Sequence, residues 1–162
     1  MALIKSISGI RGTIGGKPND NLTPLDVVKF TAAYGTWLKS QFKSKRKKVV
    51  IGRDGRISGF IVKNIVTSTL SALGIDVIDT DYSTTPTVEM AVKTLKADGG
   101  IILTASHNPK EWNALKLLNK KGEFISGAEG ELILQLAANE SFDFETVNNL
   151  GTIVENNTTL KT

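Results

Sequence analysis

Apolar and polar positions along the chain follow two different spacings in turn. In four segments apolar residues recur every three or four positions after a Ser or Thr, which predicts capped helices over 24–42, 59–73, 86–97 and 127–139. Short apolar runs around these segments predict strands over 3–7, 49–51, 75–78, 100–104 and 153–154. Helices and strands therefore alternate, which is typical of an α/β domain.

This alternation predicts how the sheet is built. Strand–helix units in series, joined by short connections with right-handed crossovers, form a mainly parallel sheet with helices on both faces. We therefore expect a three-layer α/β/α fold. Ligands of such sheets bind at the carboxyl ends of the strands, so the loops that follow the strands are where chemistry is expected.

Two stretches depart from this pattern. The glycine-rich segment 9–16 is predicted to be a loop, because its glycines permit tight turns and close backbone approach. Further on, a strand over 114–118, a turn over 119–122 and a returning strand over 123–125 predict an antiparallel hairpin near the C-terminal part of the domain.

Length and composition are those of one globular domain. The chain has 162 residues, of which 40% are hydrophobic and 22% charged, close to the averages of soluble domains. We assign residues 1–150 to this domain and residues 151–162 to a final strand or a linker. The polar ending carries no capping or stop signal, so we expect the chain to be a fragment of a longer protein.

Residue types that are absent or rare exclude several kinds of site. Without Cys the chain has no disulfide, thiolate metal site or cysteine nucleophile, and a single His excludes a clustered-histidine zinc site. No apolar run approaches the ~20 residues of a membrane span, and the N-terminus lacks the apolar core of a signal peptide. We therefore expect a cytoplasmic protein without membrane contact.

The net charge of +4 comes from one place, because five basic residues lie within 43–48. Such a run can bind nucleic acid. This one has no interleaved aromatic residues and lies where a helix is predicted to end, where solvent and the helix dipole favour cations. We expect no nucleic-acid partner, and nucleic-acid binding by this run is the lesser alternative.

The candidate chemistry is concentrated in Thr104–Pro109, directly after a predicted buried strand. Pro109 prevents helix continuation, so Ser106 is expected on an exposed loop at the carboxyl end of the sheet. Serine-hydrolase chemistry is excluded, because no Gly-x-Ser-x-Gly surrounds Ser106 and the only His is its neighbour, His107.

This hexapeptide resembles the phosphoserine loop of the α-D-phosphohexomutases, which include phosphoglucomutase/phosphomannomutase and phosphoglucosamine mutase. Three further segments resemble motifs of that family and follow in the family's order: Ile10–Gly12, Gly52–Ser58 and Asn113–Lys116. Four ordered matches are much more specific than one. The chain is therefore similar to the phosphoserine-bearing first domain, domain I, of this family.

The resemblance implies an enzyme that interconverts hexose 1-phosphate and hexose 6-phosphate. Ser106 gives its phosphoryl group to the hexose phosphate and takes back the other phosphate from the resulting hexose 1,6-bisphosphate, which is also the primer. For His107 the resemblance implies a catalytic contact, and a hydrogen-bonding turn residue is the alternative. The other residues to which it assigns catalytic or phosphate-binding roles are Arg11, Gly12, Asn108 and Lys116.

Charge and strand alternation support two of these assignments. A phosphoserine carries about −1.5 to −2 charges near neutral pH, and the fork of an arginine such as Arg11 suits phosphate oxygens. In the predicted strand over 114–118, Leu115 and Leu117 point to one face and Lys116 to the other, from which Lys116 can reach back as acid/base partner. The alternatives are an arginine in a surface ion pair and a solvated lysine.

Two arginines in the loop after the strand over 49–51 have a structural interpretation. Arg53 and Arg56 flank Asp54 in sequence, and we expect both to brace this loop through Asp54 rather than to act in catalysis.

The sequence also departs from the family. Ser8-Gly9 and Gly59 stand where an acidic residue and a second serine are common, and the choice among glucose, mannose and glucosamine phosphates stays open. The family's Asp-Gly-Asp-Gly-Asp-type loop is missing, so the chain would supply one Mg²⁺ ligand, a phosphate oxygen on Ser106. We therefore expect the domain to work with domains II–IV of the same polypeptide and to be inactive alone. The alternative is a non-catalytic sugar-phosphate-binding domain.

Overall fold

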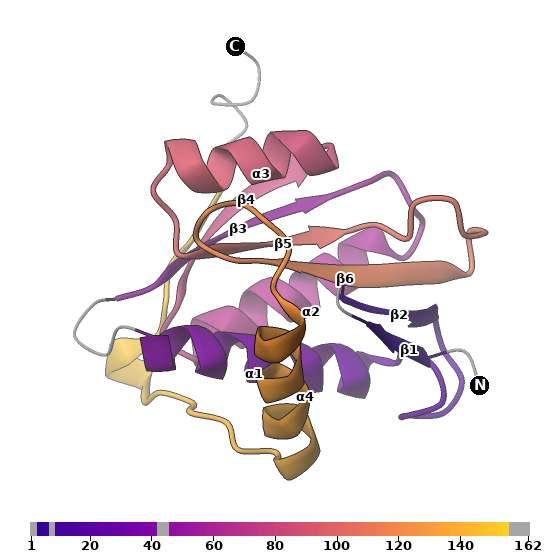
Figure 1. The fold of residues 1–162 in the computed structure, drawn as a ribbon, viewed down its shortest axis with the longest axis horizontal. Coiled ribbons are helices and arrows are strands. Elements are labelled where there is room, and N and C mark those ends of the chain that lie inside the picture. The colour runs from indigo at the N-terminus through magenta and orange to yellow at the C-terminus, as the bar shows by residue number, and fades with distance from the viewer. Residues whose placement is uncertain (1–2, 7–8, 42–45, 156–162) are drawn as a thin grey trace.

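A seven-stranded sheet forms the centre of the structure, a computed structural model that describes residues 3–6, 9–41 and 46–155. The strand order is β1-β2-β6-β5-β3-β4-β7 (Figure 1). The strands are β1 (Leu3–Ser6), β2 (Gly9–Thr13), β3 (Lys48–Arg53), β4 (Asp76–Tyr82), β5 (Gly99–Leu103), β6 (Trp112–Leu118) and β7 (Ile153–Glu155). The helices are α1 (Pro24–Gln41), α2 (Gly59–Ala72), α3 (Thr85–Thr94), α4 (Gly127–Asn139) and the short 3-10 helix η1 (Val147–Asn149).

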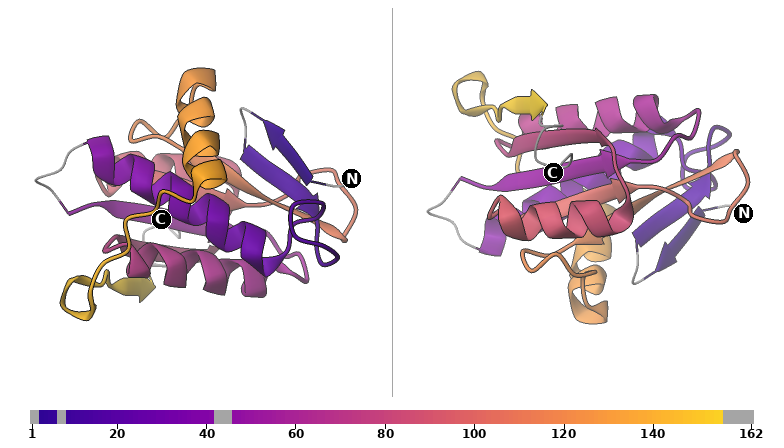
Figure 2. Two further views of the ribbon diagram at one scale, coloured as in Figure 1. Left: turned by 90° about the horizontal axis from the view of Figure 1, so that it is seen from below. Right: turned by 90° about the horizontal axis from the view of Figure 1, so that it is seen from above.

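Helices cover both faces of the sheet (Figures 1 and 2). On one face α3 packs against β3 and β5, over a small apolar cluster that includes Val50 and Val92. On the other face lie α1 and α2, with α4 packed against α1, over the main cluster that includes Tyr34 and Ile51. This arrangement confirms the predicted three-layer α/β/α fold.

The sheet combines a parallel part with an antiparallel part. β3 pairs in parallel with β4 and β5, and β7 pairs in parallel with β4. β6 runs antiparallel to β5, β2 antiparallel to β6, and β1 antiparallel to β2. The predicted parallel strands are confirmed, and the antiparallel part begins where the strand pattern changes, at β6.

The prediction of a loop over residues 9–16 is wrong for its first part, because Gly9–Thr13 forms β2. Two partner strands, β1 and β6, satisfy its backbone. Gly9 has a φ of +135°, and a Cβ there would lie 2.0 Å from the carbonyl oxygen of Leu115. Glycine therefore permits the close approach of β2 to β6 rather than a turn.

The predicted hairpin after β6 is only partly present. The turn forms, with Gly122 at a φ of +74° and its N–H donating to the carbonyl of Asn119 at 3.0 Å. The returning strand is reduced to one bridge between Leu118 and Phe124. α4 starts at Gly127, which leaves the returning segment too short for a longer ladder.

Helix ends follow local signals with three exceptions. Ser126 and Glu129 form a capping box at the start of α4, as the spacing predicts, and α2 ends before Gly74, whose φ is +80°. α3 begins one residue earlier than predicted, capped by Thr84, and it ends at Thr94 rather than at 97, because Lys96 adopts a left-handed φ of +53°. Ser58 makes no side-chain cap for α2, because its hydroxyl instead accepts a hydrogen bond from the Asn113 amide at 2.9 Å.

The basic run is less solvated than its composition suggests. Residues 42–45 lie outside the described residues. The exposed Arg46 pairs with Asp76, with Nε and Oδ1 3.1 Å apart, and Lys47 is only 2% exposed directly before β3. This part of the run leads into a strand rather than ending a helix. Within the described ranges, no helix combines the length and the apolar composition that crossing a bilayer requires.

A buried tyrosine joins α1 to the sheet. The hydroxyl of Tyr34, which is fully buried, donates to the carbonyl of Leu118 at 2.5 Å and accepts from the N–H of Gly100 at 3.0 Å. Burial raises the pKa of Tyr34, so the hydroxyl keeps its proton as a donor. It therefore connects the first residues of β5 with the last residue of β6.

Replacing Tyr34 with Phe keeps the ring but leaves a buried N–H and a buried carbonyl without this partner. We expect Tyr34→Phe to lower the free energy of unfolding by about 1–3 kcal/mol, measured by chemical denaturation. Tyr82→Phe, which removes a hydroxyl from a 65% exposed side chain, is the matched control and should cost much less. Equal losses in the two variants would contradict the role of Tyr34.

A charged cluster ties α2 to the end of β4. Lys63 Nζ lies 2.9 Å from Asp79 Oδ2 and 3.2 Å from Asp81 Oδ1, and Arg53 Nε lies 3.0 Å from the same Asp81 oxygen. Arg53 also stacks 4.2 Å above the ring of Tyr82. The prediction that Arg53 acts through Asp54 is therefore wrong, because its charge is engaged by the neighbouring strand.

Partial burial alone would raise the pKa of Asp81, but hydrogen bonds from Arg53 and Lys63 outweigh it and lower this pKa. A lowered pKa stabilises the fold above the unfolded value of about 4, and that stabilisation is lost as pH falls through the folded pKa. Asn also tolerates the φ of +55° at this position. Asp81→Asn should therefore be less stable than the parent at pH 7, with a difference that shrinks below pH 4.

Denaturation curves from pH 7 to pH 3 test this expectation. Asp143→Asn is the control, because that carboxylate is 63% exposed in its pair with Lys39. It should show a smaller difference at every pH. A difference for Asp81→Asn that does not change with pH would contradict the account.

Candidate functional site

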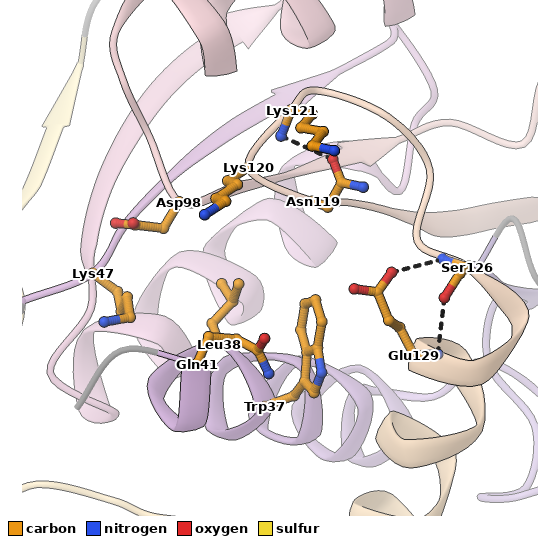
Figure 3. A pocket seen from close by; sticks show the side chains of 10 residues that line it. All are labelled: Trp37, Leu38, Gln41, Lys47, Asp98, Asn119, Lys120, Lys121, Ser126 and Glu129. Atoms are coloured by element: carbon orange, nitrogen blue, oxygen red, sulfur yellow. Dashed lines mark hydrogen bonds between the residues drawn. The ribbon is translucent and has the colours of Figure 1, made fainter.

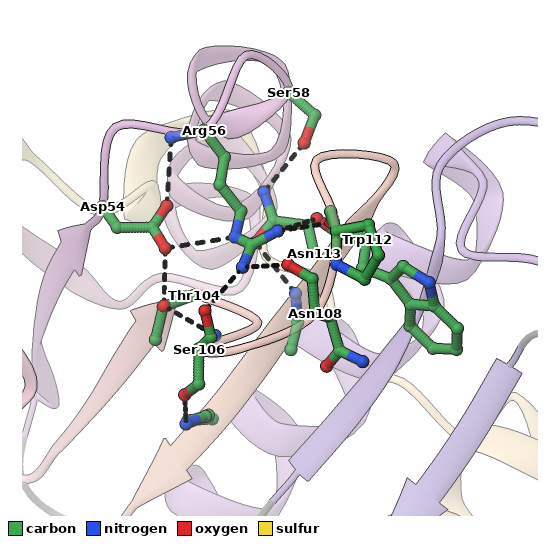
Figure 4. Close-up of polar contacts among 11 residues, drawn as sticks. Asp54, Arg56, Ser58, Thr104, Ser106, Asn108, Trp112 and Asn113 are labelled. Atoms are coloured by element: carbon green, nitrogen blue, oxygen red, sulfur yellow. Dashed lines mark hydrogen bonds and ion pairs between the residues drawn. The ribbon is translucent and has the colours of Figure 1, made fainter.

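The loops that follow β3 and β5 meet at the carboxyl end of the parallel strands, where Figure 4 shows their polar contacts. The loop after β5 carries Ser106, which is exposed, as predicted. Ser106 has a φ of +52°, a left-handed conformation that is uncommon for residues other than glycine. Its N–H donates to Thr104 Oγ1 at 3.1 Å.

Lys116 lies directly opposite this loop. Its Nζ donates to Ser106 Oγ at 2.7 Å. β6 runs antiparallel to β5 with Lys116 opposite Ile102, and Leu115 and Leu117 are buried while Lys116 is not. The predicted reach of Lys116 back to Ser106 is confirmed, and its role in proton transfer remains a prediction.

Arg11 joins the two side chains from β2. It lies opposite Ala114 of β6, and with Ser106 and Lys116 it lines a cleft of about 90 Å³, together with Ser6, Gly9, Ala105 and Ala114. The Arg11 side chain is exposed and makes no hydrogen bond or ion pair with any residue that the structure describes. Its guanidinium is therefore available to an anion in the cleft.

Arg56 contacts Asp54, as the sequence predicts, and also braces the serine loop, which the sequence does not predict. Its Nε lies 3.2 Å from Asp54 Oδ2. Its two terminal nitrogens donate to four backbone carbonyls, three in the loop after β5 and one in β6: Ser106 at 2.9 Å, Asn108 at 2.9 Å, Pro109 at 2.7 Å and Trp112 at 3.1 Å. All five N–H donors of the guanidinium thus have an acceptor within the protein.

Three residues singled out by the sequence do not line this cleft. His107 is exposed, and its ring contacts no hydrogen-bond or ion-pair partner in the described parts of the chain. Asn108 is half-buried and contributes its N–H to the carbonyl of Ala105 at 3.0 Å. Gly12 is buried within β2, between Leu3 and Asn113. Their assigned roles remain predictions.

Sequence reasoning missed the function of Thr104, although the residue belongs to the hexapeptide. Its hydroxyl donates to Asp54 Oδ2 at 2.6 Å and accepts the Ser106 N–H, which links the loops after β3 and β5. Only the position of Thr104 two residues before Ser106 hints at this contact, because hydroxyl-to-backbone bonds over two residues are common in turns.

The charges around Ser106 suit a phosphate and do not suit a complete metal site. Among the residues that the structure describes, two cations and no carboxylate line the cleft. Across the described residues, no group of three His, Cys, Asp or Glu side chains is placed to hold a metal ion. The residues present therefore do not fit an Mg²⁺ ion on their own, and one phosphate oxygen on Ser106 would be the ligand from this chain.

A larger cavity of about 440 Å³ lies at the opposite end of the sheet, near the amino ends of β3 and β5 (Figure 3). Trp37 and Leu38 of α1 lie on one side, and Asp98 and Lys47 on another (Figure 3). None of the site residues predicted from the sequence lines it. Three of the residues that the sequence singles out, Arg11, Ser106 and Lys116, line the smaller cleft instead.

Comparison with known proteins supports the family resemblance of the four sequence motifs. Residues 3–144 match the family model described as "Phosphoglucomutase/phosphomannomutase, alpha/beta/alpha domain I". The chain is 38% identical over 142 residues to the phosphoglucomutase/phosphomannomutase of Thermococcus kodakarensis, covering 86% of this chain and 31% of that protein. It is 36% identical over 143 residues to the phosphoglucosamine/phosphogalactosamine mutase of Sulfurisphaera tokodaii, covering 88% of this chain and 30% of that protein.

A solved structure shows the same fold. The crystal structure of a phosphoglucomutase/phosphomannomutase family protein from Burkholderia thailandensis matches with a TM-score of 0.74 and 23% identity, covering 94% of this chain and 33% of that one. The chain thus spans about a third of the length of these relatives. It belongs to the phosphoglucomutase/phosphomannomutase family, with the α/β/α fold of that family's domain I.

Proposed function

We propose that this chain is the phosphoserine-carrying domain of a hexose-phosphate mutase. The observation that carries the proposal is the distance of 2.7 Å between Lys116 Nζ and Ser106 Oγ in a cleft that Arg11 also lines. A hydroxyl beside two cations is suited to hold a phosphoryl group and to release it. Ser106 carries that group in the working enzyme.

The chemical step exchanges one P–O bond for another. The bond between phosphorus and Ser106 Oγ breaks as an oxygen of the hexose forms a new bond to the same phosphorus. Lys116 donates a proton to the departing Oγ and is left neutral, while the proton lost by the sugar hydroxyl passes to water. In the return transfer Ser106 Oγ attacks the other phosphate, neutral Lys116 takes the Oγ proton back, and the departing sugar oxygen takes a proton from water.

The cations of the cleft account for the binding of the phosphate. A phosphoserine carries about −1.5 to −2 charges, which spread over the transferring oxygens in the transition state. Arg11 offers two parallel N–H donors and Lys116 a point charge, and both lie at the cleft before the step begins. Arg11 therefore holds the phosphoryl group, while Lys116 donates a proton to Ser106 Oγ and later accepts it.

The two transfers interconvert hexose 1-phosphate and hexose 6-phosphate through a hexose 1,6-bisphosphate, which also primes the serine. Glucose, mannose and glucosamine phosphates are the candidate substrates. In this proposal residues 1–150 form domain I, residues 151–162 lead toward domain II, and domains II–IV of the same polypeptide supply the sugar contacts. Those domains also supply the remaining Mg²⁺ ligands, and a bound Mg²⁺ would neutralise phosphate charge.

Removing the phosphoryl carrier tests the proposal in the longer polypeptide. We expect Ser106→Ala to abolish mutase turnover in a coupled assay with a hexose 1,6-bisphosphate primer. The loss of stability should not exceed about 1 kcal/mol, because Ser106 is exposed. Ser141→Ala, at another exposed serine, is the control, and the 162-residue chain alone should be inactive. A Ser106→Ala enzyme with ordinary turnover would overturn the proposal.

Lys116 is tested separately from Ser106. Lys116→Met keeps an unbranched side chain only one atom shorter, and it should lower kcat by about 10²–10⁴-fold, the range for loss of acid/base help, while the phosphoryl group on Ser106 is retained. Lys93→Met, at an exposed lysine of α3, controls for the loss of one surface charge. A kcat for Lys116→Met within a few-fold of the parent would assign Lys116 to the protein surface.

A further inference from the structure

We propose that Asp54, Arg56 and Thr104 are positioning residues for phosphoryl transfer: they hold the backbone of Ser106 in the one conformation that directs its Oγ to Lys116. This inference rests on the proposed function. None of the three residues lines the cleft, so they act through Ser106 rather than on the substrate.

Both peptide groups of Ser106 are held by side chains. Its N–H donates to Thr104 Oγ1 at 3.1 Å, and its carbonyl accepts from Arg56 Nη2 at 2.9 Å. A non-glycine residue in the left-handed region costs on the order of 1–3 kcal/mol and persists only where its surroundings impose it. These two hydrogen bonds impose the φ of +52°.

Asp54 determines how Thr104 can act. The Thr104 hydroxyl donates its one proton to Asp54 Oδ2 at 2.6 Å, so its oxygen lone pairs are left to accept the Ser106 N–H. Asp54 itself is fixed beside the end of β5, because its own N–H donates to the carbonyl of Leu103 at 3.1 Å. The Asp54 carboxylate therefore fixes the Thr104 hydroxyl, and through it the Ser106 N–H, relative to the end of β5.

Arg56 connects the serine loop with the strand that carries Lys116. The guanidinium, with a side chain only 11% exposed, binds the carbonyls of Ser106 and of Trp112, the first residue of β6 (Figure 4). One rigid group therefore contacts both the phosphoryl carrier and the start of the lysine strand. Since all its donors have protein acceptors, Arg56 has none left for a phosphate, unlike Arg11.

This geometry bears on the rate rather than on binding. In-line transfer depends on the placement of Oγ, and a shift of about 1 Å can cost on the order of 10²-fold in rate. In the proposed function Arg11 binds the substrate phosphate in a cleft that none of the three residues lines. Loss of the contacts that Asp54, Arg56 and Thr104 make with the Ser106 loop should therefore lower kcat and leave KM nearly unchanged.

Two variants remove the contacts of Arg56 and Thr104 with Ser106 and change the shape of the side chains little. Arg56→Lys keeps the charge but loses the planar fork, and Thr104→Val keeps the volume but loses the hydroxyl. In the longer polypeptide we expect kcat to fall about 10–100-fold in each, with KM for the hexose phosphate within about two-fold of the parent. Thr104→Ser restores the hydroxyl and should recover kcat to within a few-fold.

The control is Arg46→Lys, because Arg46 also pairs with an aspartate and donates to a backbone carbonyl, that of Leu150, away from Ser106. It should leave kcat unchanged. A second readout uses the 162-residue chain without any assay of turnover. In NMR spectra, Arg56→Lys and Thr104→Val should change the φ-dependent coupling of Ser106 and speed exchange of its amide hydrogen, whereas Thr104→Ser and Arg46→Lys should not.

The outcomes separate this inference from the proposed function. If Ser106→Ala is inactive while Arg56→Lys and Thr104→Val keep the parent kcat, the positioning role is wrong and the phosphoserine stands. A raised KM with unchanged kcat would make Arg56 a substrate contact and overturn the inference. If Ser106→Ala stays active, the proposed function fails and the inference falls with it.

Discussion

The antiparallel pairing of β6 with β5 is the constraint on which the site depends. The chain leaves β5 at the Ser106 loop and returns along β6, which brings Lys116 Nζ to 2.7 Å from Ser106 Oγ. β2 then pairs with the free edge of β6 and adds Arg11 to the same cleft. A parallel neighbour in place of β6 would need a long crossover and would not return the chain to the serine. Tyr34 holds the far ends of β5 and β6 together.

Ladder hydrogen bonds hold the strands but not the turn between them. The segment from Ser106 to Pro109 depends instead on Arg56, whose guanidinium binds carbonyls along it, and on Asp54 and Thr104 behind it. Three arginines of the domain therefore have different roles. Arg11 is open toward the cleft, Arg53 is engaged by Asp81, and Arg56 is used by the loop.

Local signals in the sequence predict much of this structure. Ser126 with Glu129 marks a helix start, and the alternation of Leu115 and Leu117 gives the direction of Lys116, because both depend on near neighbours alone. Gly9–Thr13 was missed as a strand because its glycines are explained only by the approach of β6, which lies a hundred residues away. The long-range contacts of Arg56 were likewise not visible beyond Asp54.

The central claim is that Ser106 carries the phosphoryl group. Its most direct test is peptide mapping by mass spectrometry after the longer polypeptide has been incubated with hexose 1,6-bisphosphate. The account predicts one phosphoryl group, located on Ser106. This group disappears from the protein when hexose monophosphate is added in excess, and it reappears on the sugar. A phosphoryl group on another residue, or a Ser106 peptide that never gains one while turnover proceeds, would contradict it.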